Sequence, residues 1–150
     1  MRQHPDHHDA ELLLQLYDLR REEKLRQARD WFSRELQAAS LEELNTRFPL
    51  GSRERTFFRM VVSYWDMAAS IVNQGLVQEE LFFENTTELW VVWQKVKPLA
   101  PAMRDLYQNP FMWKNLEALG EKFEKWMVQR APKGVAALRK LIVEGSAKGK

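Results

Sequence analysis

The stretch SRERTFFRMVVSYWDMAASIVNQ, Ser52 to Gln74, decides the fold. With about 100° between successive residues of a helix, its apolar side chains cover an arc of about 220°, whereas a helix on a protein surface shows a stripe of roughly 100°. The arc contains Phe57, Phe58, Met60, Val61, Val62, Tyr64, Trp65, Met67, Ala68, Ala69, Ile71 and Val72. Such a helix must be covered on more than one side, so we expect it at the centre of a bundle.

The rest of the chain follows the same helical period, and no segment shows the sustained alternation of strands. The sequence therefore predicts an all-α fold, a single-domain bundle of six or seven helices around a central hydrophobic helix at about residues 52–74. We found no internal repeat and no long linker, so one domain is expected over residues 1–150. Flexible ends are expected at about 1–8 and 144–150.

Residues 10–39 allow two interpretations. A helix is expected to start after Asp9, whose carboxylate can cap free amides, but its apolar stripe lapses through RREEK, residues 20–24. One long helix with a solvated middle and two separate helices both fit this pattern. Glu22 with Arg26, and Asp30 with Arg34, have the favourable i,i+4 order, which favours one helix.

Helix signals also divide the second half of the chain. Gly75 is the expected left-handed residue after the central helix. A short acidic helix, QEELFFEN, precedes a Trp-rich one, which Pro98 and Pro101 end or kink. Asn109 and Pro110 predict a helix start, with Asn as the cap, and that helix is expected to reach about Arg130. A last helix is expected to begin at Pro132. Its inward residues should be Val135, Leu138, Leu141 and Ile142.

The Trp-rich segment ELWVVWQKVKP, Glu88 to Pro98, carries more apolar residues than one buried face requires. On a helical wheel, Trp90 and Val91 point away from that face, among lysines and a glutamine. Either a neighbouring helix of the same chain covers them, or another molecule does. The second possibility makes Trp90 and Val91 candidate partner-binding residues for self-association or for another protein.

Two polar features are candidate ligand sites. The central helix begins with Ser52, Arg53, Arg55 and Arg59, and free amides at a helix start can bind an anion, although ordinary capping by Ser52 also explains the pattern. The polar strip of the same helix consists of Arg59, Ser63, Asp66, Ser70 and Asn73. It is either a solvated seam or one wall of a polar site.

Composition excludes most catalytic and metal chemistry. The chain has no Cys, and its three histidines, His4, His7 and His8, all lie in the first eight residues. Without the tail folding back, this excludes a Ser-His-Asp triad, a Cys-His pair, a standard zinc site and a Glu-x-x-His di-iron bundle. We therefore expect no catalytic residues, no metal and no cofactor, and any enzymatic activity would be limited to carboxylate chemistry.

Charge and hydropathy bear on partners and location. The net charge is +2, and the positive excess lies in the last thirty residues, too dilute to predict a nucleic-acid surface. No apolar run approaches the roughly 18 residues of a membrane span, and the N-terminus holds no signal-peptide h-region. We expect a cytoplasmic protein with no transmembrane segment and no nucleic-acid partner.

The run FFRMVVSYWDMAASIVNQGLVQEELFF, followed by LWVVWQKVKP and NPFMWKNLEAL, resembles a family of bacterial helical domains of unknown function. The shared elements are an aromatic helix closed by Gly, a short acidic helix, a Trp-bearing helix that ends near Pro, and an Asn-Pro pair. The resemblance covers roughly residues 57–120 and implies no catalytic residues. Some members of that family carry membrane segments upstream, and this chain shows none.

These observations predict a non-enzymatic protein-interaction or regulatory module that associates with itself or with another protein through the Trp90 surface. The alternative is a sensor of a small molecule or anion, which would use the helix start at Arg53 or an aromatic pocket between helices.

Overall fold

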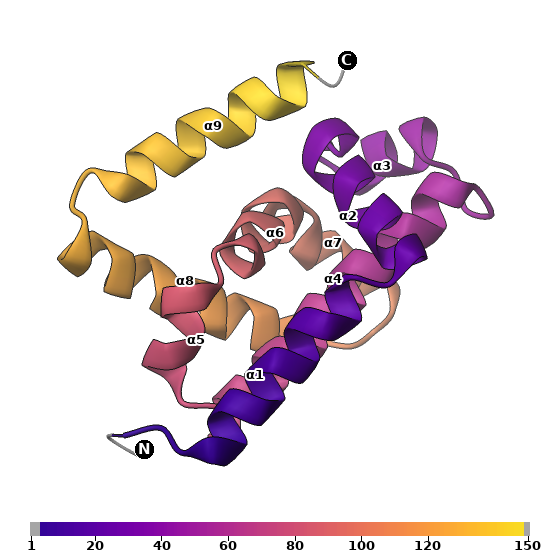
Figure 1. Ribbon diagram of the computed structural model, residues 1–150. Helices are drawn as coiled ribbons and strands as arrows, with labels where there is room; N and C mark the ends of the chain where they lie inside the picture. The colour runs from indigo at the N-terminus through magenta and orange to yellow at the C-terminus, as the bar shows by residue number, and fades with distance from the viewer. Residues whose placement is uncertain (1–3, 149–150) are drawn as a thin grey trace.

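The computed structural model describes the backbone of residues 4–148 and the side chains of residues 4–143. Within this range it holds helices and no β-strand, which confirms the all-α prediction (Figure 1). Nine α-helices occur there, more than the six or seven expected. They are α1 (His7–Arg20), α2 (Glu23–Glu35), α3 (Leu41–Arg47), α4 (Arg53–Asn73), α5 (Glu79–Asn85), α6 (Glu88–Val96), α7 (Ala100–Leu106), α8 (Lys114–Arg130) and α9 (Gly134–Lys148), with the 3₁₀-helix η1 (Lys97–Leu99) before α7.

The predicted central helix is α4, which packs against α2, α5, α6 and α8. Ser52 caps its start by accepting a hydrogen bond from the amide of Arg55, and Gly75 follows its end with φ +80°. Trp65 is 1% exposed, and most of the apolar arc is buried with it. Met67 is the exception, since 42% of it is exposed. The arc is therefore somewhat narrower than the sequence predicted, but α4 does lie at the centre.

The preference for one continuous helix over residues 10–39 is wrong, because α1 ends at Arg20 and α2 begins at Glu23. Glu22 caps α2 by accepting hydrogen bonds from the amides of Lys24 and Leu25. These two bonds are the main cause of the lowered pKa of Glu22, and the charges of Lys24 and Arg26 add to it. The expected pair between Arg34 and Asp30 does form, as an exposed ion pair.

Helix α1 begins at His7, three residues earlier than expected, because Asp6 is the cap and Asp9 lies in the first turn. The Asp9 carboxylate is fully buried and joins two distant parts of the chain. It accepts hydrogen bonds from the amide of Asp6 at 2.7 Å and from the amide of Gln78 at 2.6 Å. Asp9 thus fastens the start of α1 to the start of α5, while the Tyr64 hydroxyl donates to the Leu16 carbonyl and ties α1 to α4.

The predicted helix start at Asn109 and Pro110 is also wrong. The Asn109 side chain accepts a hydrogen bond from the Phe111 amide, which closes a turn instead of capping a helix. Helix α8 begins only at Lys114, after Trp113, whose φ of 62° interrupts the helical path. The helix ends at Arg130 as expected.

An ion pair joins three helices near the centre of the molecule. Glu88 accepts hydrogen bonds from Arg29 Nε at 2.7 Å and from Arg29 Nη2 at 2.8 Å, so the pair is bidentate. The same carboxylate accepts a hydrogen bond from Trp65 Nε1 at 2.9 Å. These contacts join α2, α6 and α4, and they satisfy an indole N–H that would otherwise be buried without a partner.

Helix α9 turns back from the end of α8 and packs on α2 and α8 (Figure 1). Val135 is buried, and Leu138 and Ile142 pack against the core as predicted. Leu141 is 62% exposed, so its predicted inward position is wrong. The single domain and the flexible ends stay predictions, and residues 1–3 and 149–150 lie outside the described residues.

Helices α6 and α8 approach closely at Gly120. A Cβ atom added to Gly120 would lie 2.9 Å from Cδ1 of Trp93, and the Trp93 ring is itself buried. The absence of a side chain at this position therefore allows α8 to pack directly on the indole ring.

We predict that Gly120→Ala lowers the free energy of unfolding. Overpacking of a dense core costs about 1–3 kcal/mol, which exceeds the roughly 0.5–1 kcal/mol that Ala gains over Gly inside a helix. Urea unfolding should show this loss, whereas Glu121→Ala, at the exposed neighbouring position, should change stability by less than about 0.5 kcal/mol. A Gly120→Ala variant at least as stable as the wild type would contradict the close packing.

Lys95 closes the C-terminal end of α2. Its ammonium group donates hydrogen bonds to the carbonyl oxygens of Phe32, Ser33 and Leu36, at 2.9, 2.9 and 3.1 Å. The last carbonyls of a helix have no partner within the helix, so this contact between α6 and α2 satisfies them.

Lys95→Met should therefore lower the free energy of unfolding at pH 7 by about 1–2 kcal/mol, because the carbonyls lose their donor. Lys97→Met removes an exposed lysine two residues away and should leave stability nearly unchanged. Denaturant titration of both variants tests the prediction, and equal losses would contradict it.

The contribution of Lys95 should also depend on pH. Burial lowers the pKa of Lys95 from 10.5 to about 8. Below pH 8 Lys95 is protonated in both the folded and the unfolded chain, and burial of its charge lowers the stability of the folded chain. Between pH 8 and 10.5 the folded chain has released a proton that the unfolded chain still binds, so the stability of the wild type relative to Lys95→Met should rise with pH. A difference that stays constant up to pH 10.5 would contradict this assignment.

Candidate functional site: a pocket between α4 and the α7–α8 loop

The structure does not expose the predicted partner-binding residues. Trp90 is 0% exposed, and its ring lies 6.4 Å from the ring of Phe123 on α8. The guanidinium of Arg139 on α9 lies 5.7 Å from the same indole ring. Val91 is half-buried and packs against the core. Of the two alternatives that the sequence left open for Trp90, the structure has the first, because α8 and α9 of the same chain cover its ring.

The arginines at the start of α4 separate into different environments. Ser52 Oγ accepts from the Arg55 amide and donates to the Pro49 carbonyl, so it is used in capping. Arg53 is exposed and stacks over Phe57, with 5.1 Å between its guanidinium carbon and the ring centroid. Arg55 turns into the protein, whereas Arg59 stays exposed. The four side chains therefore do not converge at the helix start, and anion binding there stays a prediction. Arg55 and Arg59 both line a pocket beside α4.

That pocket has a volume of about 290 Å³ and lies between α4, α7 and the loop that joins α7 to α8. Its walls are mainly apolar, with a few polar side chains. The apolar lining residues are Leu50, Phe58, Val62, Met103, Met112 and Trp113, and the polar ones are Arg55, Arg59, Ser63 and Tyr107. An apolar cavity with a few convergent polar groups is the usual form of a small-molecule site.

Arg55 is the unusual member of this lining, because it is a charged side chain that is only 8% exposed. Its Nη1 atom donates to Asn45 Oδ1 at 2.7 Å and to the Phe48 carbonyl at 3.2 Å, and both acceptors are neutral. Burial lowers the pKa of Arg55, and the nearby Tyr107 raises it in part. No Asp or Glu among the described residues forms an ion pair with Arg55.

The α7–α8 loop forms one wall of the pocket and has an uncommon backbone. Gln108 and Trp113 have positive φ values of 50° and 62°. A bulky residue such as Trp rarely adopts this left-handed conformation, which costs roughly 1–2 kcal/mol. Surrounding contacts must therefore hold Trp113 in place, as is common at binding sites.

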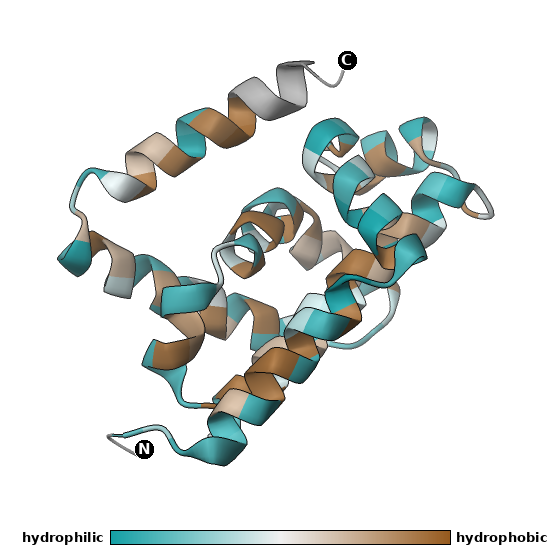
Figure 2. Cartoon of the chain, viewed as in Figure 1, coloured by the Kyte–Doolittle hydropathy of each residue, from teal (hydrophilic) through white to brown (hydrophobic). Residues whose placement is uncertain are grey.

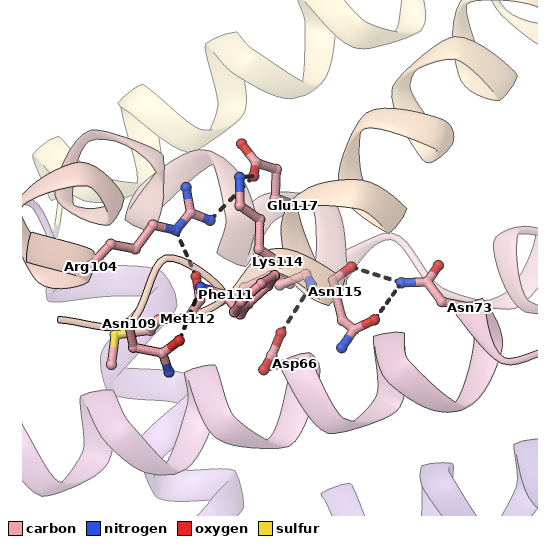
Figure 3. A network of polar contacts seen from close by, with 10 residues as sticks. Asp66, Asn73, Arg104, Asn109, Phe111, Met112, Lys114, Asn115 and Glu117 are labelled. Atoms are coloured by element: carbon pink, nitrogen blue, oxygen red, sulfur yellow. Dashed lines mark hydrogen bonds and ion pairs between the residues drawn. The ribbon is translucent and has the colours of Figure 1, made fainter. Parts of the chain in front are cut away.

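A polar network beneath the loop supplies those contacts (Figure 3). Arg104 Nε on α7 donates to the Met112 carbonyl at 2.7 Å, and its Nη2 atom donates to Glu117 Oε1 at 3.2 Å. Lys114 reaches the same carboxylate at 3.1 Å. Burial alone would raise the pKa of Glu117, but Lys114 and Arg104 outweigh it and lower the pKa.

The polar strip of α4 divides between this network and the pocket. Asp66 accepts a hydrogen bond from the Leu116 amide at 3.0 Å, and Asn73 Nδ2 donates to the carbonyl and the side-chain oxygen of Asn115 at 3.1 Å each (Figure 3). Burial raises the pKa of Asp66, although the Leu116 amide and Arg104 oppose this. Ser63 and Arg59, further toward the start of α4, line the pocket. The strip is therefore not a simple solvated seam, because its second half anchors α8.

The pocket mouth has an exposed apolar rim. Leu50 is 75% exposed and Tyr107 is 56% exposed, and both line the cavity. Leu106 and Phe111 of the same loop region are 58% and 78% exposed. Large apolar side chains grouped in this way are typical of a surface that contacts a ligand or partner.

The lining residues can bind, but they lack the groups of the common catalytic mechanisms. Among the residues that the structure describes, the polar groups that line the pocket are two guanidiniums, a hydroxyl, a phenol and the indole N–H of Trp113, with no carboxylate or imidazole. A serine without a neighbouring base is a weak nucleophile. Among the described residues there is no cluster of three or more His, Asp or Glu side chains that could bind a metal ion.

The sequence pointed to Arg55 and Arg59 but could not place the other wall. Met103, Tyr107, Met112 and Trp113 lie 40 or more residues further along the chain, and the Asn-Pro pair predicted a helix where the structure has a loop. The one sequence feature that could have indicated this wall is the group of aromatic and apolar residues on both sides of Pro110.

We predict that Arg104→Met loosens this wall. Loss of its charge-assisted hydrogen bonds should reduce the free energy of unfolding by about 1–3 kcal/mol, and the methyl NMR signal of Met112 should shift. Lys114→Met is the matched control, since it removes only an exposed ion pair to the same Glu117 and should cost less than about 0.5 kcal/mol. Equal effects of the two substitutions would show that Arg104 does not support the loop.

Comparisons with known proteins place the chain in a family. A model of the family described as "Domain of unknown function (DUF4760)" matches residues 5–126, a range that contains every lining residue of the pocket. No curated protein and no solved structure matches the chain. No helix of the described residues is long and apolar enough to cross a membrane. The resemblance to an uncharacterised helical family is confirmed, and the chain belongs to the DUF4760 family of domains of unknown function.

Proposed function

We propose that the protein is a non-enzymatic regulatory module that binds an anionic small ligand in the pocket between α4 and the α7–α8 loop. This is the alternative that the sequence offered, in the form of an aromatic pocket between helices. The protein-interaction module that the sequence favoured stays a prediction, although Trp90 itself is buried. Self-association and a cytoplasmic location stay predictions.

The observation that carries the proposal is Arg55. A cation buried without an opposite charge is costly, and proteins usually pair such groups. Here the buried guanidinium borders a cavity of about 290 Å³ and has no carboxylate partner among the described residues. An anionic ligand in that cavity would provide the missing charge.

The position of the pocket supports a regulatory role. Its walls come from α4, at the centre of the bundle, and from a loop whose backbone is held in an unfavourable conformation. A ligand that contacts both walls would favour the ordered loop by its binding free energy. The exposed Leu50 and Tyr107, which line the pocket, would then be held in one arrangement.

Methionine methyl groups offer a direct test. Met103 and Met112 line the pocket, whereas Met67 and Met127 do not. We predict that a fragment library containing anionic compounds, titrated into protein with ¹³C-labelled Met methyl groups, yields hits that shift the signals of Met103 and Met112 and leave Met67 and Met127 unchanged.

A variant that fills the pocket provides the control. Ser63→Trp places a large side chain at an exposed lining position, and Thr56→Trp places it at an exposed position of the same helix outside the pocket. Binding should be lost in the first variant and kept in the second. The proposal is wrong if no fragment perturbs Met103 and Met112, or if the hits bind Ser63→Trp as well as the wild type.

A further inference from the structure

We infer that the ligand of this pocket is a small aromatic carboxylate, an inference that rests on the proposed function and specifies its ligand class. Among the described residues no Asp or Glu lines the pocket beside the buried Arg55, and the free part of its guanidinium matches a planar anion. Aromatic side chains, those of Phe58, Tyr107 and Trp113, form part of the walls.

The hydrogen bonds of Arg55 leave one side of its guanidinium available. Both bonds to Asn45 and Phe48 come from Nη1. Among residues 4–143, Nε and Nη2 have no hydrogen-bond partner. These two atoms form the edge of a guanidinium that donates two parallel bonds to a carboxylate. Arg55 itself is fixed by its Nη1 bonds, so little side-chain freedom would be lost when the anion binds.

The charge available suits a monoanion better than a phosphate. Arg59 is the second cation of the pocket, but it is exposed, and its charge is therefore screened by solvent. The hydroxyl of Ser52 is already used in capping, and Arg53 stacks on Phe57 outside the pocket. One buried guanidinium balances a single carboxylate charge, whereas a phosphate dianion would keep an unpaired charge in an apolar cavity.

The apolar walls favour a ring over a flexible chain. Phe58 and Trp113 pack edge to face, with 6.0 Å between their ring centroids. Met103 and Met112 also line the cavity, and thioethers make favourable contacts with aromatic rings. A volume of about 290 Å³ lies at the small end of ligand sites, which selects compounds with one or two rings.

The experiment uses 3-phenylpropanoate as the probe and follows the Met103 and Met112 methyl signals. We expect saturable binding of the acid, and binding at least about tenfold weaker for the neutral 3-phenylpropanamide, because the charged hydrogen bonds are lost. Hexanoate, which has the charge without the ring, should also bind more weakly. Inorganic phosphate at the same ionic strength should not displace the acid.

Three arginine variants test which side chain binds the carboxylate of the probe. Arg55→Lys keeps a cation but removes the planar pair of donors, so affinity for the acid should fall about tenfold or more while the Met127 signal shows a folded protein. Arg59→Met should reduce affinity by a smaller factor. Arg53→Met, the matched removal of an exposed arginine outside the pocket, should leave affinity unchanged.

The outcomes separate this inference from the proposed function. Equal binding of acid and amide would overturn carboxylate recognition, equal binding of hexanoate would overturn the aromatic class, and displacement by phosphate would identify an inorganic anion. Arg55→Lys with wild-type affinity would also overturn the inference. If 3-phenylpropanoate gives no shift, this ligand class is wrong, whereas the pocket proposal fails if the whole fragment library leaves Met103 and Met112 unchanged or if its hits bind Ser63→Trp as well as the wild type.

Discussion

Burial of the apolar surface of α4 is the constraint from which the arrangement of the other helices follows. The apolar side chains of this helix cover more than one side of it, so α2, α5, α6 and α8 pack around it. Figure 2 shows the result, with hydrophilic residues along the outer sides of α2 and α3 and hydrophobic residues gathered where helices meet. The large aromatic side chains make this cover possible with short helices, because each one fills much of the space between two elements.

Cover of α4 is incomplete along its polar strip, and the pocket lies at the N-terminal part of that strip. The polar strip of the helix offers hydrogen bonds instead of apolar surface, and α8 uses those of Asp66 and Asn73 to hold its first turn. Toward the N-terminal part of α4 the strip continues with Ser63 and Arg59, but the chain opposite is a loop and not a helix. Side chains of the loop approach α4 without filling the space. The same strip thus anchors one helix and leaves a cavity beside it.

The sequence predicted the fold class and α4 because both depend on periodicity, which a single helix shows without knowledge of its neighbours. The predicted helix boundaries were wrong where one side chain could form either of two local interactions. Glu22 could pair along a helix or cap a new one, and Asn109 could cap a helix or close a turn. In both cases the side chain accepts a hydrogen bond from a backbone amide two residues further along, and the sequence alone does not show which local bond forms. Trp90 shows another limit, because α8 and α9, which cover it, follow it in the chain, and a wheel of α6 alone cannot show them.

Arg55 distinguishes the pocket from a packing defect. A void left by imperfect packing is lined by apolar atoms and would be filled at little cost by a larger side chain. Here the chain instead buries a guanidinium against two neutral acceptors, although apolar side chains of similar size would avoid the cost of desolvation. The loop opposite bears a second cost, the left-handed backbone of Trp113, and Arg104 opposes it by holding the preceding carbonyl. Both costs fall on residues that line the same cavity. A bound anion would reduce the cost of the unpaired charge of Arg55, and its binding free energy would offset the backbone cost at Trp113. Because a ligand stabilises only the state that it binds, the ordered loop and the occupied pocket would each favour the other.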